Sequence, residues 1–182
     1  MKQLSVAHLE PLDKKEGFWR VVIETPKGCH NKYAFDQELG VFVLKGVLPE
    51  GMIFPYDFGF LPGTVGEDGD PLDVLLLMDE AAFCGCVVPS RLIGVIEADQ
   101  TETDGKTERN DRLVAVPVKS HVYSDCANLK DLNENRVNEI SEFFVSYNRI
   151  HGKKFKVRDV CGPKRADELT HEGIKRLAKA HK

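Results

Sequence analysis

Short apolar runs separated by Gly, Pro, Asn and Asp fill the first two thirds of the chain. The runs are rich in Val, Ile, Leu and Phe, which favour pleated strands. The run 74–77 is continuously apolar, as is typical of a strand buried on both faces. The pattern predicts strands at residues 19–24, 32–35, 41–48, 74–78, 87–96 and 113–118.

The hydrophobic period changes in the last third of the chain. Apolar residues recur there at spacings of three and four, which predicts an amphipathic helix over 131–148. A second helix is expected from Pro163, because Pro suits a first helical turn. Its predicted inner face consists of Ala166, Leu169, Ile174, Leu177 and Ala178. Strands followed by helices predict an α+β fold, with a small antiparallel barrel at its centre.

Composition limits the class of protein. The chain has 182 residues, 42% of them hydrophobic, and contains no repeat or linker, so a single globular domain over 1–182 is expected. The net charge of −4 disfavours nucleic acid as a partner, since a nucleic-acid binder needs a positive field. The longest apolar stretch, 81–88, is much shorter than the roughly 20 residues that span a bilayer, so no membrane association is expected.

The five cysteines form an odd set without zinc-finger spacing, and residues 1–10 lack a secretion signal. We therefore expect a cytoplasmic protein whose thiols are small core side chains.

Asp68, Asp70 and Asp73 place three carboxylates within six residues, directly before the apolar run 74–78. Carboxylates this close repel one another, and divalent cations that prefer oxygen ligands offset that charge. The spacing excludes an EF-hand loop, whose sixth position must be Gly where this chain has Asp73. The alternative is a solvated acidic turn. A second acidic stretch, 97–111, is predicted to be mostly a polar loop, which would close over the same site.

The string Asp68-Gly69-Asp70-Pro71-Leu72-Asp73-Val74 resembles the signature of the soluble family I inorganic pyrophosphatases. Segments from residue 20 to 150 resemble that family in the same order: 21–24, 32–33, 52–55 leading to Gly59, 113–117, and Phe143-Phe144 with Tyr147. The resemblance implies a five-stranded OB-like barrel with flanking C-terminal helices. It also implies hydrolysis of inorganic diphosphate to two orthophosphates with several Mg²⁺ ions, for which Mn²⁺ is a candidate substitute, and a homo-oligomer, expected to be a hexamer.

The resemblance also implies roles for individual residues. Asp68 and Asp73 would bind metal, with Asp73 bridging two ions, and Asp70 would be both a ligand and the base that generates the nucleophile. Glu24 would support the metals and their water, while Lys32 and Tyr147 would hold phosphate oxygens. Considered without the family, these last three residues also suit a surface charge, an edge-strand lysine and a core aromatic.

The chain departs from the family pattern at several phosphate-binding positions. The family Arg falls at Gly46, two family Tyr residues are Phe54 and Phe58, an acidic position is Ala34, and a Lys is replaced by Asn148. Lys45 is therefore the candidate to reach the phosphate in place of the Arg, with Lys27, Lys153 and Lys154 as weaker candidates.

The acidic stretch is longer than in the short bacterial members of the family. Asn110 falls at a metal-binding Asp and would coordinate through its amide oxygen, and Arg112 falls at a Lys and would grip phosphate bidentately. The remaining loop ligand stays open between Asp99, Glu102 and Asp104, of which we prefer Glu102 or Asp99.

Three hypotheses for function follow. The first is a Mg²⁺-dependent inorganic diphosphatase. The second is a metal-dependent hydrolase whose substrate is a diphosphate ester such as a nucleotide. The third is a non-catalytic OB-type barrel that binds nucleic acid or a protein, which the acidic charge opposes.

Overall fold

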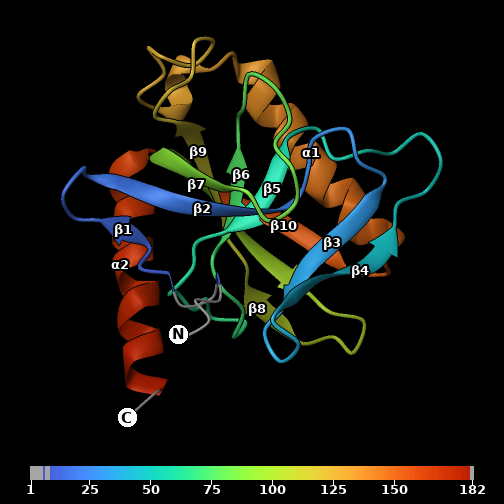
Figure 1. The fold of residues 1–182 in the computed structure, drawn as a ribbon. Coiled ribbons are helices and arrows are strands. Elements are labelled where there is room, and N and C mark those ends of the chain that lie inside the picture. Colours follow the sequence, from blue (N-terminus) through green and yellow to red (C-terminus); the bar gives the residue numbers. More distant parts are fainter. Residues whose placement is uncertain (1–5, 7–8, 181–182) are drawn as a thin grey trace. The chain divides into compact units, whose positions relative to one another are not determined.

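A computed structural model describes residue 6 and residues 9–180 of the chain (Figure 1). Its contacts divide the chain into two compact units, each of which is described by itself. Unit 1 contains Met1–Gly63, Asp73–Arg91 and Ala115–Ser124, and unit 2 contains Thr64–Leu72, Leu92–Val114 and Asp125–Lys182. Within the described residues, the helices are too short or too polar to cross a membrane. The expectation of a single domain stays a prediction.

Unit 1 is built from antiparallel strands. Strands β1 (Leu12–Asp13), β2 (Phe18–Thr25), β5 (Asp57–Phe60) and β6 (Asp73–Leu76) pair in that order. The start of β7 (Val87–Thr101) pairs with β2, from Trp19 opposite Ser90 to Val22 opposite Val87. Strands β3 (Asn31–Asp36) and β4 (Val41–Val47) form a separate two-stranded sheet.

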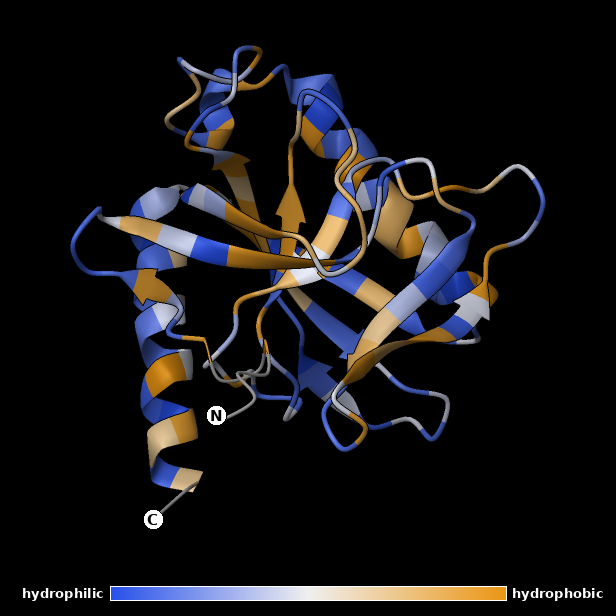
Figure 2. Ribbon diagram, viewed as in Figure 1, coloured by the Kyte–Doolittle hydropathy of each residue, from blue (hydrophilic) through white to orange (hydrophobic). Residues whose placement is uncertain are grey.

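The core of unit 1 lies around β2 and β6. Side chains of Val21 to Ile23 and of Val74 to Leu77 are almost completely buried, which confirms the expectation for the continuously apolar run. Figure 2 shows β6 in the colour of hydrophobic residues. Gly59 is required where β5 crosses β2, because a Cβ atom there would lie 1.9 Å from the carbonyl oxygen of Val22. The strand pairing therefore depends on a glycine at this position.

Unit 2 combines strands with both helices. It holds the later part of β7, β8 (Thr107–Arg109) and the start of β9 (Arg112–Pro117). A 3₁₀ turn (Leu129–Asp131), α1 (Glu134–Ile150), β10 (Lys154–Cys161) and α2 (Pro163–Ala180) follow. Strand β7 pairs antiparallel with both β8 and β10. Helix α1 packs against β10 through Phe144 and Phe155, whose ring centres are 5.7 Å apart.

The predicted α+β class is confirmed: the strands pair antiparallel, and the two helices lie in the C-terminal part of the chain with β10 between them. All six predicted strands are present, and helix α1 runs over 134–150 where 131–148 was predicted. The prediction for the inner face of α2 is partly wrong, because Ala178 is exposed while Thr170 and Gly173 are buried. The small residues at 170 and 173 let the helix approach its neighbours closely; at Gly173 a Cβ would lie 2.9 Å from Leu72.

The expectation that residues 97–111 form a polar loop is wrong. Strand β7 continues to Thr101 and pairs with β8, with Asp99 opposite Arg109 and Thr101 opposite Thr107. Gly105, at φ +88°, occupies the turn between them. A conformation with positive φ suits glycine, and Arg109 pairs with Glu97 and Asp111, which offsets part of the acidic charge that suggested a loop. We call residues 97–112 the acidic hairpin.

Candidate functional site

The segment of the three aspartates forms a tight turn. In unit 2, the backbone N–H of Gly66 donates to the carbonyl oxygen of Asp70 at 2.7 Å, and the Asp70 N–H donates to Asp68 Oδ1 at 3.2 Å. A Cβ on Gly66 would lie 2.7 Å from Asp68 Oδ1, so the turn needs glycine to bring the carboxylate this close. Asp70 is exposed and Asp68 is half-buried. Asp73, in unit 1, is half-buried at the start of β6 opposite Phe60.

Helix α2 anchors this turn. The N–H of Val65 donates to the Gly173 carbonyl at 3.2 Å, and Arg176 Nη1 donates to the Val65 carbonyl at 2.7 Å. The buried Thr64 hydroxyl accepts the Leu72 N–H at 3.1 Å. The backbone on both sides of Asp68 and Asp70 is therefore fixed, which gives the exposed carboxylates a defined setting.

Glu24 and Lys32 belong to unit 1. The Glu24 side chain is 9% exposed and its Oε1 accepts the Phe35 N–H at 2.7 Å, which ties β2 to β3. Lys32 lies opposite Gly46 in the β3–β4 ladder, and its Nζ is 5.9 Å from the centre of the Phe58 ring. Phe54 and Phe58 are both buried, with ring centres 5.7 Å apart. The two positions at which the family has Tyr are thus core positions in this chain.

Lys45 sits in a β-bulge. Lys32 faces Gly46 and Tyr33 faces Leu44, so Lys45 is the extra residue between two ladder pairs. Bulges interrupt the alternation of side chains and reorient the residue they contain. Lys45 is exposed. Lys45 directly precedes Gly46, and its role in place of the absent Arg stays a prediction.

Tyr147 and Asn148 lie near the end of α1 in unit 2. Tyr147 is half-buried, stacked on Phe143 with ring centres 6.0 Å apart, and its ring lies 4.6 Å from that of His151. Asn148 is buried and its Nδ2 donates to the Phe144 carbonyl at 2.9 Å. The Asn148 side chain therefore forms its hydrogen bond within α1.

Arg112 and Asn110 contact each other in unit 2. Arg112 is only 5% exposed, and its Nη1 donates to Asn110 Oδ1 and, at 3.2 Å, to the Asp111 carbonyl. Its guanidinium carbon lies 5.0 Å from the Phe144 ring centre and 5.4 Å from that of Phe155. The structure thus places the predicted phosphate-gripping arginine inside unit 2, against two aromatic rings.

Two of the other three candidate ligands of the acidic hairpin are paired with cations. Asp99 Oδ2 lies 2.6 Å from Arg158 Nε, and Glu102 Oε2 lies 2.6 Å from Lys153 Nζ. Hydrogen bonds from Lys153 and then Gln100 lower the pKa of Glu102. Asp104 is exposed in the turn, where its carboxylate accepts the Lys106 N–H at 2.9 Å.

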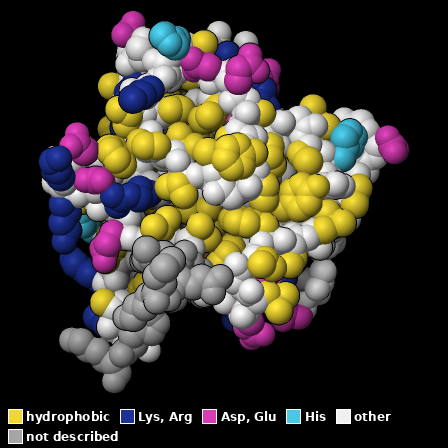
Figure 3. Space-filling view, in the orientation of Figure 1, with side chains coloured by type: hydrophobic (Ala, Val, Ile, Leu, Met, Phe, Trp, Pro, Cys, Tyr) yellow, Lys and Arg dark blue, Asp and Glu magenta, His cyan; other side chains and the backbone are white. Residues whose placement is uncertain are grey.

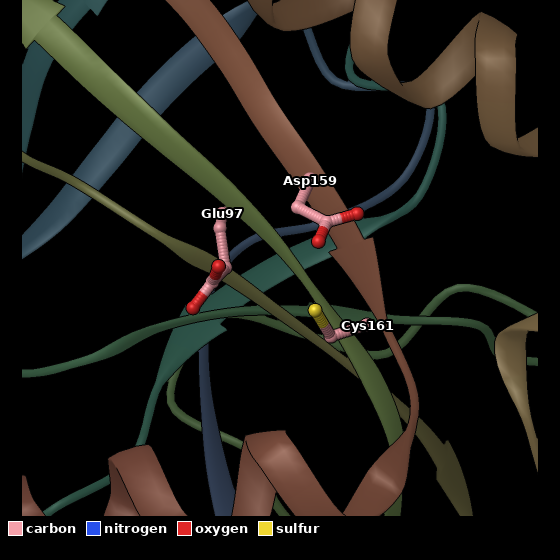
Figure 4. A group of neighbouring side chains, drawn as sticks. All are labelled: Glu97, Asp159 and Cys161. Atoms are coloured by element: carbon pink, nitrogen blue, oxygen red, sulfur yellow. The ribbon is translucent and has the colours of Figure 1, made fainter.

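A further acidic cluster on β7 and β10 was not predicted. Glu97, Asp159 and Cys161 have side-chain ligand atoms within 4.8 Å of one another (Figure 4). Glu97 already pairs with Arg109 at 2.6 Å and with Arg165 at 2.9 Å. Burial, followed by the charges of Asp159 and Glu97, raises the pKa of the Cys161 thiol. The cluster is thus compensated by protein cations and contains a protonated thiol, so it forms no evident cation site.

Asp57 is a second residue that the sequence did not single out. Its carboxylate is completely buried in unit 1, where Oδ1 accepts N–H groups from Ala82 at 3.0 Å and Lys27 at 3.3 Å. Burial raises its pKa. Asp57 lies within the segment 52–59 that resembles the family. The one feature of the sequence that could have indicated it is a charged residue among apolar neighbours.

The fold and the oxygen-rich turn fit the class of hydrolases that act on phosphate compounds, and the comparisons identify the family. The family model for inorganic pyrophosphatase matches residues 21–178. The chain is 40% identical over 159 residues to the inorganic pyrophosphatase of Synechocystis sp., covering 87% of this chain and 89% of that protein. It is 37% identical to that of Geobacillus stearothermophilus, covering 85% and 90%.

Solved structures agree with the sequence relatives. The inorganic pyrophosphatase of Thermus thermophilus superposes with a TM-score of 0.87 at 31% identity, covering 96% of this chain and 99% of that one. This chain belongs to the inorganic pyrophosphatase family. The predicted family and the prediction of an inorganic diphosphatase are thereby confirmed.

Proposed function

We propose that this protein hydrolyses inorganic diphosphate to two orthophosphates in a Mg²⁺-dependent reaction, with Asp68, Asp70 and Asp73 as its principal metal ligands. The observation that carries the proposal is the signature turn, in which Asp68 and Asp70 lie on a backbone fixed by Thr64 and α2, and Asp73 follows them in the sequence. The donors are all oxygens, which fit Mg²⁺ better than a softer metal.

Bound Mg²⁺ supplies charge neutralisation for the diphosphate oxygens and lowers the pKa of water at the site. The protein's own residues supply positioning. Asp70, exposed at the tip of the turn, accepts the proton of the attacking water. Glu24, fixed by the Phe35 N–H, supports the ligand shell from β2.

Lys32, Lys45 and Tyr147 are the groups we propose to hold phosphate oxygens. Lys32 and Lys45 flank the side-chain-free position 46 of the β3–β4 ladder, where they offer two ammonium groups in place of one guanidinium. Tyr147 offers a neutral hydroxyl. Arg112 was expected to join this set, but its Nη1 donates to the Asn110 side chain and to the Asp111 carbonyl, so we do not include it among the phosphate-binding groups.

The test is orthophosphate release from diphosphate with and without Mg²⁺. Asp70→Asn should lower kcat by about 10²-fold or more, as expected for loss of a general base. Asp125→Asn, which removes one exposed carboxylate of unit 2 outside the turn, is the matched control and should keep full activity. Metal-replete wild type without turnover would contradict the proposal. Running nucleoside diphosphates and triphosphates beside diphosphate tests the ester alternative, which predicts faster turnover of a nucleotide.

We also propose a cytoplasmic homo-oligomer. The described structure has all five cysteines as free thiols, which suits a reducing compartment. Large hydrophobic side chains exposed on unit 1 suit self-association, and Figure 3 shows side chains of this kind at the surface. They are Leu39, Val41, Leu44, Val47, Ile53, Phe83, Val87, Val118 and Val122. Light scattering tests the expected hexamer, and a monomer at micromolar concentration would contradict it.

A further inference from the structure

Three of the four oxygen donors considered as metal ligands in the acidic hairpin already face a protein cation, while Asp104, the fourth, is exposed in the turn. Asp99 pairs with Arg158, Glu102 with Lys153, and the Asn110 amide oxygen with Arg112. Neighbouring carboxylates are paired as well: Asp111 lies 2.6 Å from Arg109, and Glu108 pairs with Lys106. These four carboxylates therefore have their charge balanced without a metal ion.

The contact between Arg112 and Asn110 is more strongly fixed than the pairs of Lys153 and Arg158. The pairs of Lys153 and Arg158 leave those cations 34% and 55% exposed, so water and salt weaken them. Arg112 is buried, and the rings of Phe144 and Phe155 lie against its guanidinium. A guanidinium keeps its charge at any working pH and is favoured over an aromatic face.

A divalent ion at Asn110 would have to displace this guanidinium or lie beside it. Displacement would strip Arg112 of its aromatic contacts and of the Asp111 carbonyl. Coexistence would place two positive centres on the same amide oxygen, where repulsion is strong because the site is largely shielded from water. Asn110, being neutral, brings no charge to offset either cost.

We propose that Arg112 is a resident cation that occupies the amide oxygen of Asn110, so that the acidic hairpin holds no divalent ion and metal binding rests on the aspartate turn. This inference rests on the proposed function for the existence of that metal core. It makes Arg112 a positioning residue within unit 2 and predicts fewer bound ions than a chain with a free carboxylate at position 110.

The experiment counts bound Mg²⁺ and measures its affinity by isothermal titration calorimetry, with no substrate present. Asn110→Ala should match wild type within about twofold, because it removes no ligand. Asn110→Asp alone should also add no ion, because Arg112 pairs with the new carboxylate. Asn110→Asp combined with Arg112→Met should bind one additional ion, since methionine retains apolar contact with the rings and removes the charge.

Two outcomes overturn the inference: loss of an ion or about tenfold weaker binding in Asn110→Ala, or no additional ion in a folded double variant. Thermal unfolding verifies folding, and should the double variant be unfolded, the result for Asn110→Ala alone decides. Asp73→Asn in the same assay separates the two proposals. If Asp73→Asn binds Mg²⁺ as wild type does, the proposed metal core is wrong, whatever the result for Asn110→Ala. If Asp73→Asn and Asn110→Ala both weaken Mg²⁺ binding, the metal core stands and only the proposal for Arg112 is wrong.

Discussion

The backbone N–H of Ala82 donates a hydrogen bond of 3.0 Å to Asp57 Oδ1, which ties the segment before β7 to a carboxylate completely buried in β5. The same oxygen accepts the Lys27 N–H at 3.3 Å. Asp57 thus joins three segments of unit 1 that are far apart in the sequence.

Asp57→Ala should destabilise the protein by about 2–4 kcal/mol, because it leaves two N–H groups without their acceptor and opens a small cavity. Urea denaturation measures the effect. Asp36→Ala is the comparison, since Asp36 also accepts two backbone N–H groups but in an exposed turn, where water replaces it. A loss below about 0.5 kcal/mol for Asp57→Ala would contradict the structural role.

The pH dependence of stability should also reflect Asp57. Burial raises its pKa, so the folded protein retains this proton at pH values where the unfolded chain has released it. The contribution of Asp57 to stability is therefore most favourable at low pH and falls as pH rises through the folded pKa. Asp57→Asn should remove that fall, which denaturation curves from about pH 4 to about pH 8 would detect. Parallel pH profiles of wild type and variant would show that burial does not shift this carboxyl.

The regular elements were predictable where one local pattern decides them. The run Val74 to Leu77 is apolar at every position and is buried as expected, and Ile140 and Phe144 of the predicted helical stripe are buried in α1. Strand β10 was missed because its exposed positions carry Lys, Arg and Asp, whose pairing with β7 depends on residues about 60 positions away, such as Asp99 with Arg158.

The candidate site was predictable only as a set of residue types. The signature turn follows from the sequence, and Gly69 stands where the backbone has a positive φ of +92°. The sequence does not reveal that Arg112 turns toward Asn110, because this depends on Phe144 and Phe155 arriving from α1 and β10. Similarly, the bulge at Lys45 is set by the register of β3 against β4.

Gly59→Ala should be among the most destabilising single-methyl changes in unit 1. The added Cβ would lie 1.9 Å from the Val22 carbonyl oxygen, which is backbone and cannot rotate away, so β5 and β2 must separate at a cost of about 3 kcal/mol or more. Gly46→Ala in β4 is the matched control, since a Cβ there has no atom within 4 Å and φ is not positive. That change should alter stability by less than about 1 kcal/mol. Equal effects of the two substitutions would contradict the close approach of β5 to β2.

Lys45→Met should weaken substrate binding more than it slows the chemical step. The substitution keeps the length and apolar stem of the side chain and removes one ammonium group from the bulge beside Gly46, so a charge-assisted contact to a phosphate oxygen is lost while Asp70 is untouched. We expect KM for diphosphate to rise about tenfold at saturating Mg²⁺, with kcat changed less than about threefold. Lys119→Met, at another exposed lysine of unit 1, controls for the general loss of one positive charge and should leave both constants within about twofold of wild type. An unchanged KM in Lys45→Met would show that the bulge lysine does not take the place of the arginine that Gly46 lacks.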